Sequence, residues 1–144
     1  MILNKNLILS ENQAITATAI STNVISWEAV RAAPYEAAGI TRNLGDGTDI
    51  PMLLQITEAF NTLTSLTITF ESADNAALST NAIVMATTGA IPLASLILGY
   101  RPLMSRIIPH GQMKDFCGFR YTVTGTNPTL GKVTAALATE VQSA

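Results

Sequence analysis

Two stretches of the chain alternate strictly between apolar and polar or small side chains, and this alternation constrains the fold more than any other feature. The first is "TSLTITFE", residues 64–71, and the second is "CGFRYTVT", residues 117–124. The apolar positions are Leu66, Ile68 and Phe70 in the first stretch and Cys117, Phe119, Tyr121 and Val123 in the second. A period of two is typical of a β-strand that buries one face. We therefore predict that both stretches are strands with one apolar side.

Further strands are expected where short β-branched or apolar runs lie between turn signals, and the abundant threonine suits a pleated surface. The expected strands are residues 23–27, 51–57, 81–88, 102–108 and 132–139, and the expected turns are 45–47, 72–75, 109–111 and 125–131. Short strands at this spacing are typical of an all-β sandwich or barrel. Helix is limited to short turns in 27–38, which Pro34 interrupts, and in 92–98, where a strand is an alternative.

The length of 144 residues predicts a single domain, residues 1–144, with residues 1–9 as an N-terminal arm. Cys117 is the only cysteine, so the chain cannot form an internal disulfide. This cysteine usage is consistent with assembly in a reducing cytosol.

Charged residues are scarce for a folded domain. They make up 12% of the chain, against about 25% in typical domains, and hydrophobic residues make up 48%. A folded monomer of this mass exposes roughly 7,000 Å², so 8 basic and 10 acidic side chains leave wide neutral areas. We predict that other protein covers much of this surface. The net charge of −2 argues against nucleic acid, which needs a basic stripe.

A membrane is the other partner that so few charges could indicate. Residues 75–100 carry no charge, and a spanning helix needs about 20 mostly apolar residues. Polar residues and Pro92 interrupt this stretch, and its β-branched run predicts a strand that ends at Gly89. We therefore predict no membrane partner. The first 13 residues lack an apolar run long enough for a signal peptide.

The segment "GTNPTLGK" raises the question of a phosphate-binding loop. Such a loop reads G-x-x-x-x-G-K-[ST], follows a strand and opens a helix. Here five residues separate Gly125 from Gly131, and Val133 stands where a magnesium-binding hydroxyl is needed. We predict instead a β-hairpin, in which Asn127, Pro128 and Gly131 supply the turn.

Cys117 and His110 are the only residues of their kinds, and together they could suggest nucleophilic catalysis. A catalytic thiolate needs an electropositive, partly exposed site within hydrogen-bond reach of its base. Cys117 instead shares an apolar face with Phe119 and Tyr121, which favours a buried structural thiol. His110 follows a proline in a predicted turn, so we expect it at the surface or in an interface. One histidine and one cysteine cannot form a structural zinc site by themselves.

The carboxylates lie at predicted loops and strand ends, where solvated charge is the default, so no glycosidase-like pair is assigned. The "GDGTD" loop, residues 45–49, could attract calcium but lacks the ligand spacing of an EF-hand. Trp27 could stack on a sugar, although an anchor in the core or an interface is favoured. We predict a protein that is not an enzyme, with no catalytic residue, no cofactor and no metal.

Several segments resemble the capsid cement, or decoration, proteins of tailed bacteriophages in the Bbp16-like family. The resemblance lies in "RNLGDGTDIPMLLQITEAFNTLTSLTITFESADN" (residues 42–75) and "IIPHGQMKDFCGFRYTVTGTNPTLGKVTAAL" (residues 107–137), with a similar opening, "SENQAITATAISTNVIS" (residues 10–26). It implies a jelly-roll-like antiparallel β-sandwich that forms a homodimer or homotrimer on the outer surface of an icosahedral head. There it would bridge neighbouring major capsid proteins of the HK97-like fold. It also implies production in the bacterial cytoplasm and no active site.

The low charge indicates three regions as candidate contact surfaces: the arm of residues 1–9, the segment 27–40, and the apolar region 91–100. Arg42 is expected to form interface or surface hydrogen bonds. The residues that we predict to contribute are Ile2, Leu3, Leu7, Trp27, Tyr35, Arg42, Leu96, Tyr100 and His110.

Other functional classes remain open from the residues alone. A carbohydrate- or receptor-binding β-sandwich of a virion would use Trp27 or Tyr35 as a stacking platform. A small hydrolase would depend on Cys117 or His110. A head–tail connector or a major coat subunit would differ from a cement protein in its copy number per particle.

Overall fold

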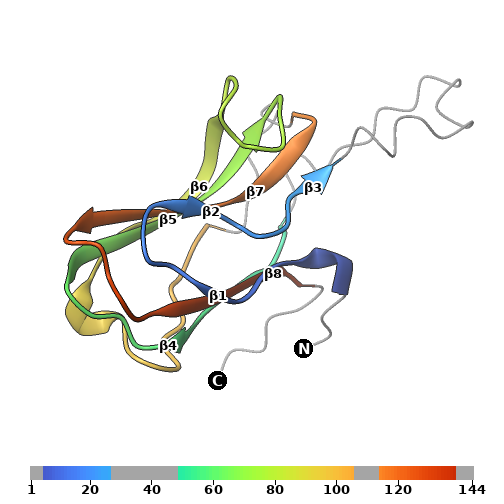
Figure 1. The fold of residues 1–144 in the computed structure, drawn as a ribbon. Coiled ribbons are helices and arrows are strands. Elements are labelled where there is room, and N and C mark those ends of the chain that lie inside the picture. Colours follow the sequence, from blue (N-terminus) through green and yellow to red (C-terminus); the bar gives the residue numbers. More distant parts are fainter. Residues whose placement is uncertain (1–4, 27–48, 106–113, 139–144) are drawn as a thin grey trace, which may run out of the picture.

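The structure, a computed structural model, describes residues 5–26, 49–105 and 114–138 (Figure 1). Within these ranges the regular structure is almost entirely strand, in two antiparallel sheets that face each other. The predicted all-β sandwich with short helical turns is therefore confirmed. The helical turns are η1 (Lys5–Leu7) and η3 (Leu93–Ser95), and η3 lies within the predicted segment 92–98.

The smaller sheet has the strand order β1-β8-β4. Its strands are β1 (Ile8–Ala14), β8 (Lys132–Leu137) and β4 (Met52–Glu58). Strands β4 and β8 match the predicted segments 51–57 and 132–139 closely. Strand β1 was not predicted, because "ILSENQA" alternates poorly, and it begins inside the expected N-terminal arm. Residues 1–4 of that arm lie outside the described residues.

The larger sheet has the order β2-β7-β5-β6, and β3 also pairs with β7. Its strands are β2 (Ala19–Ile20), β3 (Ile25–Ser26), β5 (Leu63–Ala73), β6 (Ile83–Pro92) and β7 (Phe116–Gly125). Strands β5 and β7 contain the two alternating stretches, and they pair from Leu63 opposite Gly125 to Ala73 opposite Phe116. These two long strands form the centre of the sheet.

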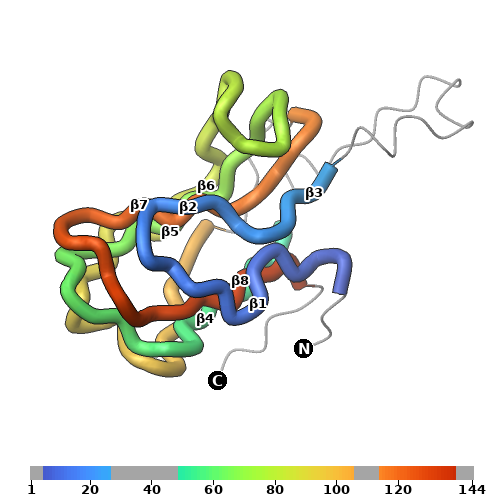
Figure 2. The backbone as a smooth tube through the Cα atoms, viewed as in Figure 1, coloured from blue at the N-terminus to red at the C-terminus, as the bar shows by residue number. Residues whose placement is uncertain are grey.

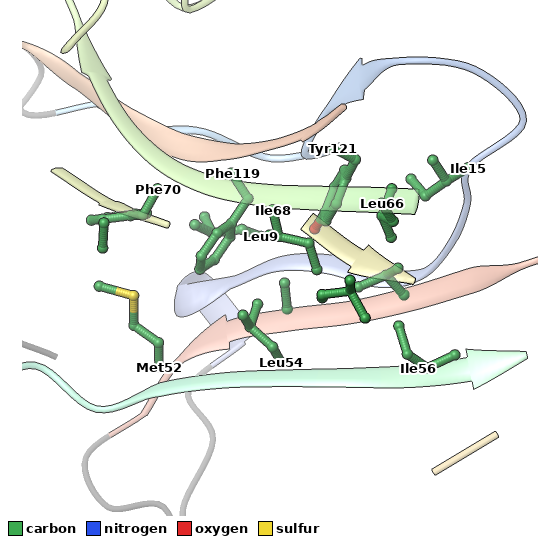
Figure 3. Packing of buried hydrophobic residues seen from close by; sticks show 14 of the residues in the cluster. Leu9, Ile15, Met52, Leu54, Ile56, Leu66, Ile68, Phe70, Phe119 and Tyr121 are labelled. Carbon is green, nitrogen blue, oxygen red and sulfur yellow. The ribbon is translucent and has the colours of Figure 1, made fainter. Parts of the chain in front are cut away.

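The alternation of β5 and β7 places their apolar side chains between the two sheets, as predicted. Leu66, Ile68, Phe70, Phe119 and Tyr121 are fully buried, and Figure 3 shows them facing the side chains of the smaller sheet. The rings of Phe70 and Phe119 pack with their centroids 5.1 Å apart. Each such side chain contributes roughly 1.5–3 kcal/mol when fully buried.

Residues 125–131 connect the two sheets and do not form a hairpin, so that part of the prediction is wrong. Strand β7 lies in the larger sheet and β8 in the smaller one, and Figure 2 shows the chain crossing between them. The physical reason is that β5 occupies one edge of β7, while β2 and β3 occupy the other. The segment is nevertheless a turn between strands, and a strand follows it where a phosphate loop would require a helix.

One predicted turn boundary and one predicted strand need correction. The turn expected at 72–75 starts later, because Ser72 and Ala73 still pair with β7. The strand expected at 102–108 is absent from its described part, since residues 102–105 join neither sheet. Residues 106–108 lie outside the described ranges.

The sequence predicted that this strand ends at Gly89, but strand β6 continues to Pro92. Gly89 has a φ of 70° and lies at an irregularity in the pairing with β5. The hydroxyl of Thr88 accepts the backbone N–H of Ile68 at 3.1 Å, and the hydroxyl of Thr87 accepts that of Gly89 at 3.1 Å. Threonine side chains thus replace missing ladder bonds, and the strand continues through the bulge.

A partly buried chain of polar groups joins the two sheets beside the apolar core. The hydroxyl of Ser10, in β1, donates to Oε1 of Gln13 at 2.7 Å and lies 2.7 Å from the hydroxyl of Tyr121, in β7. Because Ser10 has one proton to donate, the Tyr121 hydroxyl is the donor to Ser10. Oε1 of Gln13 also accepts the N–H of Thr22, and its Nε2 donates to the carbonyl of Ile20. Burial raises the pKa of Tyr121 far above its ordinary value, so it remains a neutral donor.

Because of this polar chain, we expect two single substitutions to lower the free energy of unfolding by different amounts. Ser10→Ala leaves the buried Tyr121 hydroxyl without its acceptor, so we expect it to lower the free energy of unfolding by roughly 1–3 kcal/mol. Tyr121→Phe removes the hydroxyl itself and keeps the bond from Ser10 to Gln13, so we expect a loss of about 1 kcal/mol or less. Urea denaturation measures both. A larger loss for Tyr121→Phe than for Ser10→Ala would contradict this account.

Candidate functional site

The structure places only some of the predicted contact residues. Those outside the described ranges are Ile2, Leu3, Trp27, Tyr35, Arg42 and His110. Leu7 is half-buried and packs against the core, and Tyr100 is 36% exposed. Leu96 is 1% exposed and belongs to the core, so its assignment to an outer contact surface is corrected. Its side chain points inward because the backbone of η3 turns Leu93 and Leu96 toward the sheets.

The thiol of Cys117 is fully buried, as expected for a structural cysteine. Its sulfur lies 3.6 Å from the hydroxyl of Ser72, its register partner in β5. In the described part of the chain, no group of three or more histidine, cysteine or acidic side chains could hold a metal ion. Within the same residues, no helix has the length and apolar character needed to cross a bilayer.

A partly buried ion pair lies at the end of the larger sheet where β5 ends and β7 begins. Glu71, whose side chain is 7% exposed, accepts from Nε of Arg120 at 2.9 Å and from the hydroxyl of Thr69 at 2.7 Å. Arg120 also donates from Nη2 to the carbonyl of Leu78. Leu78 is fully buried against Gly118, on the outer side of the sheet. The hydrogen bond from Arg120 and the packing of Leu78 on Gly118 therefore fix the loop after β5 onto the sheet.

A second, more exposed ion pair, between Lys114 and Asp74, joins the segment before β7 to the loop after β5. Nζ of Lys114 lies 3.2 Å from Oδ1 of Asp74 and donates to the carbonyl of Asn81 at 2.7 Å. The side-chain amide of Asn81 donates to Oδ2 of Asp74 at 2.7 Å. Both hydrogen bonds to Asp74 lower the pKa of its carboxyl group, and the bond from Asn81 has a larger effect than the bond from Lys114. We name this set, with Glu71 and Arg120, the charged end.

The opposite end of the sandwich is built from three connecting segments, residues 59–62, 93–100 and 125–131, which we name the three-loop end. They lie together at the left of the view, where the β4–β5 connection, η3 and the β7–β8 connection meet (Figure 1). The N–H of Phe60 donates to the carbonyl of Leu96 at 3.0 Å. A side chain on Gly131 would collide with the ring of Phe60, so glycine is required there.

Asn61 holds the β7–β8 connection in place. Its Oδ1 accepts the backbone N–H groups of Thr129 and Leu130 at 2.9 and 3.0 Å. Its Nδ2 donates to the hydroxyl of Thr129 at 2.8 Å. The neighbouring Thr62 donates its hydroxyl to the carbonyl of Asn127 at 3.2 Å. The loop that carries Leu130 is therefore fixed by side chains from the loop between β4 and β5.

The three-loop end exposes large apolar side chains and carries no charge. Leu98 is 70% exposed, Ile97 60% and Leu130 54%, and none of the residues 59–62, 93–100 or 125–131 is ionisable except Tyr100. Glu58 and Lys132, which flank it, form an ion pair of 2.5 Å, and Arg101, which follows Tyr100, is exposed. The hydrogen bond from Lys132 lowers the pKa of Glu58. This end can therefore form apolar contacts.

Sequence reasoning identified only one of these three segments. The uncharged stretch 75–100 indicated the region 91–100, although Leu98 and Ile97 carry the exposed area rather than Leu96. Asn61 and Leu130 were missed, because the sequence contains no local signal that brings residues 61 and 130 together. The absence of charge in all three segments was readable, but only the fold shows that they share one end.

Comparison with known proteins gives one positive result. The family model described as Bbp16 matches residues 9–137. This range includes every strand from β2 to β8 and nearly all of β1. A search of curated proteins found no match.

The bonds of Asn61 predict a local effect of its removal. Asn61→Ala removes the acceptor of two backbone N–H groups, so we expect the amides of Thr129 and Leu130 to exchange with deuterium about fivefold faster, or more. Asn75 provides a matched control at the charged end, since its Oδ1 accepts the N–H groups of Ser79 and Thr80 at 2.9 and 3.0 Å.

Asn75→Ala is expected to accelerate exchange at Ser79 and Thr80 and to leave Thr129 and Leu130 unchanged. Hydrogen exchange followed by NMR resolves all four amides. Equal protection of Thr129 and Leu130 in the Asn61→Ala variant and the unmodified protein would show that Asn61 does not hold the loop.

Proposed function

Because the chain belongs to the Bbp16 family, we propose that it is a structural protein of a tailed-phage virion, and specifically a capsid cement protein. In this proposal it binds the outer surface of the icosahedral head and stabilises contacts between major capsid subunits. The family match over residues 9–137 is the observation that carries the proposal. The proposed location is the virion, after synthesis in the bacterial cytoplasm.

The physical character of the chain supports a structural role. A cement protein needs a rigid scaffold and a large surface whose desolvation costs little free energy. Two sheets packed around a continuous apolar core provide the first. The second is provided by a charge content of 12% and by described ion pairs that place opposite charges together. No catalytic group is part of the proposal.

Affinity in such a system comes from area and multiplicity. Each stable contact is expected to bury more than about 1,000 Å² in total. A homodimer or homotrimer, which we propose as the binding form, would engage several shell subunits at once. Its first contact then raises the effective concentration for the next. The carbohydrate-binding alternative depended on Trp27 and Tyr35, which lie outside the described residues, and no described feature favours it.

The proposal predicts a direct result with phage heads. Purified protein mixed with expanded heads that lack it is expected to add density outside the shell in electron micrographs. The decorated heads are also expected to release their DNA at a higher temperature than bare heads, because the added contacts oppose internal pressure. Heads that stay bare at saturating protein would contradict the proposal. Binding to glycans without binding to heads would favour the carbohydrate-binding alternative.

A further inference from the structure

We propose that the three-loop end is the surface through which this protein docks onto the head, and that it fits an uncharged, mainly apolar patch of the shell. The inference rests on the proposed function and adds to it the docking face and the chemistry of the partner. Three observations support it: the distribution of charge, the exposed apolar side chains, and the fixed geometry of the loops.

The charge distribution distinguishes the two ends of the sandwich. The charged end carries Glu71, Asp74, Lys114 and Arg120, whereas the three segments of the three-loop end contain no acidic or basic residue, and the exposed Arg101 directly follows the second of them. A charged group of the partner buried against a neutral face would lose its hydration without gaining a counter-charge. The complement of the three-loop end is therefore a neutral surface.

The exposed apolar area is concentrated in the same place. Ile97, Leu98 and Leu130 are each more than half exposed in this end. When another surface covers such side chains, association is stabilised by roughly 25 cal/mol for each Å² of apolar area that is buried. Neighbouring exposed apolar groups of this kind are typical of contact sites between proteins.

The loops already have the fixed geometry that a docking surface requires. Asn61 binds the backbone at Thr129 and Leu130, and Phe60 binds Leu96 and packs on Gly131. The apolar side chains are thus presented from backbone that is held before binding. Less conformational entropy is lost on association, and more of the contact energy becomes affinity.

The edge of β6 is a weaker candidate for the same role. Among the described residues β6 pairs only with β5, and its ten residues carry no charge. Two irregularities interrupt its pairing with β5, and its threonine side chains bond to its own sheet. Bulges of this kind twist an edge away from a new strand. The three-loop end has no such obstacle.

The test uses heads that lack the protein, titrated with labelled full-length variants and sedimented. We expect the double variant Ile97→Ser with Leu98→Ser to raise the Kd for heads by at least about tenfold, because two large apolar contacts are lost. Val84→Ser is the matched control: Val84 is 53% exposed and pairs with Glu71 at the charged end. We expect this control to bind like the unmodified protein.

A second variant separates charge from shape. Asn61→Asp keeps the acceptor oxygens for Thr129 and Leu130 and adds one charge to the neutral end. We expect its thermal midpoint to stay close to that of the unmodified protein and its Kd for heads to rise at least about tenfold. For the unmodified protein we expect the Kd to change less than about threefold between roughly 0.05 and 0.5 M NaCl, because the three segments contain no charged side chain that could form an ion pair with the head.

The outcomes distinguish this inference from the proposed function. If the unmodified protein decorates heads but the Ile97/Leu98 variant and the Val84 control bind equally well, the docking face is wrong and the cement function stands. If binding of the unmodified protein instead weakens steeply with salt, the claim that the partner surface is uncharged is wrong, and the cement function again stands. If the Ile97/Leu98 substitutions change the oligomeric state and leave head binding intact, the face joins copies of this chain, and the inference fails. No decoration by the unmodified protein overturns both.

Discussion

The apolar face that β5 and β7 present must be buried, and the rest of the structure depends on this constraint. Leu66, Ile68 and Phe70 lie beside Phe119 and Tyr121, and together they form a continuous surface that neither strand could hide alone. The smaller sheet covers it with residues of β1, β4 and β8, which come from the first, middle and last parts of the chain. The connection 125–131 crosses between sheets because β8 belongs to this cover.

Burial of that face also determines which polar side chains need a hydrogen-bond or ion-pair partner inside the protein. Tyr121 brings its hydroxyl into the core, and Ser10 and Gln13 supply hydrogen bonds that continue to the backbone of the larger sheet. On the outer side of the same sheet, Arg120 neutralises the buried carboxylate of Glu71. Removing one partner of either set leaves a buried group without compensation, which is costlier than removing both. These polar contacts thus specify how the sheets and the outer loop meet.

The two ends of the sandwich differ in chemistry although the same strands connect them. At one end the loops are joined by ion pairs, and at the other by the carboxamide of Asn61 and the ring of Phe60. A cement protein, the role that we propose, would need one surface that loses little free energy on desolvation and another that stays hydrated. The neutral three-loop end fits the first requirement. Its rigidity and its exposed Ile97 and Leu98 are consequences of how β4, β6 and β7 end.

The amino-acid pattern alone determined that the chain forms strands, which faces of β5 and β7 are apolar, and that Cys117 is buried. These properties are local, because a period of two depends only on neighbouring residues. Only the tertiary structure decided that residues 125–131 cross between sheets, that Leu96 points inward while Leu98 points outward, and that Asn61 meets Leu130. Strand pairing and loop contacts join residues far apart in sequence, and the free energy of those contacts has no signature in any short segment.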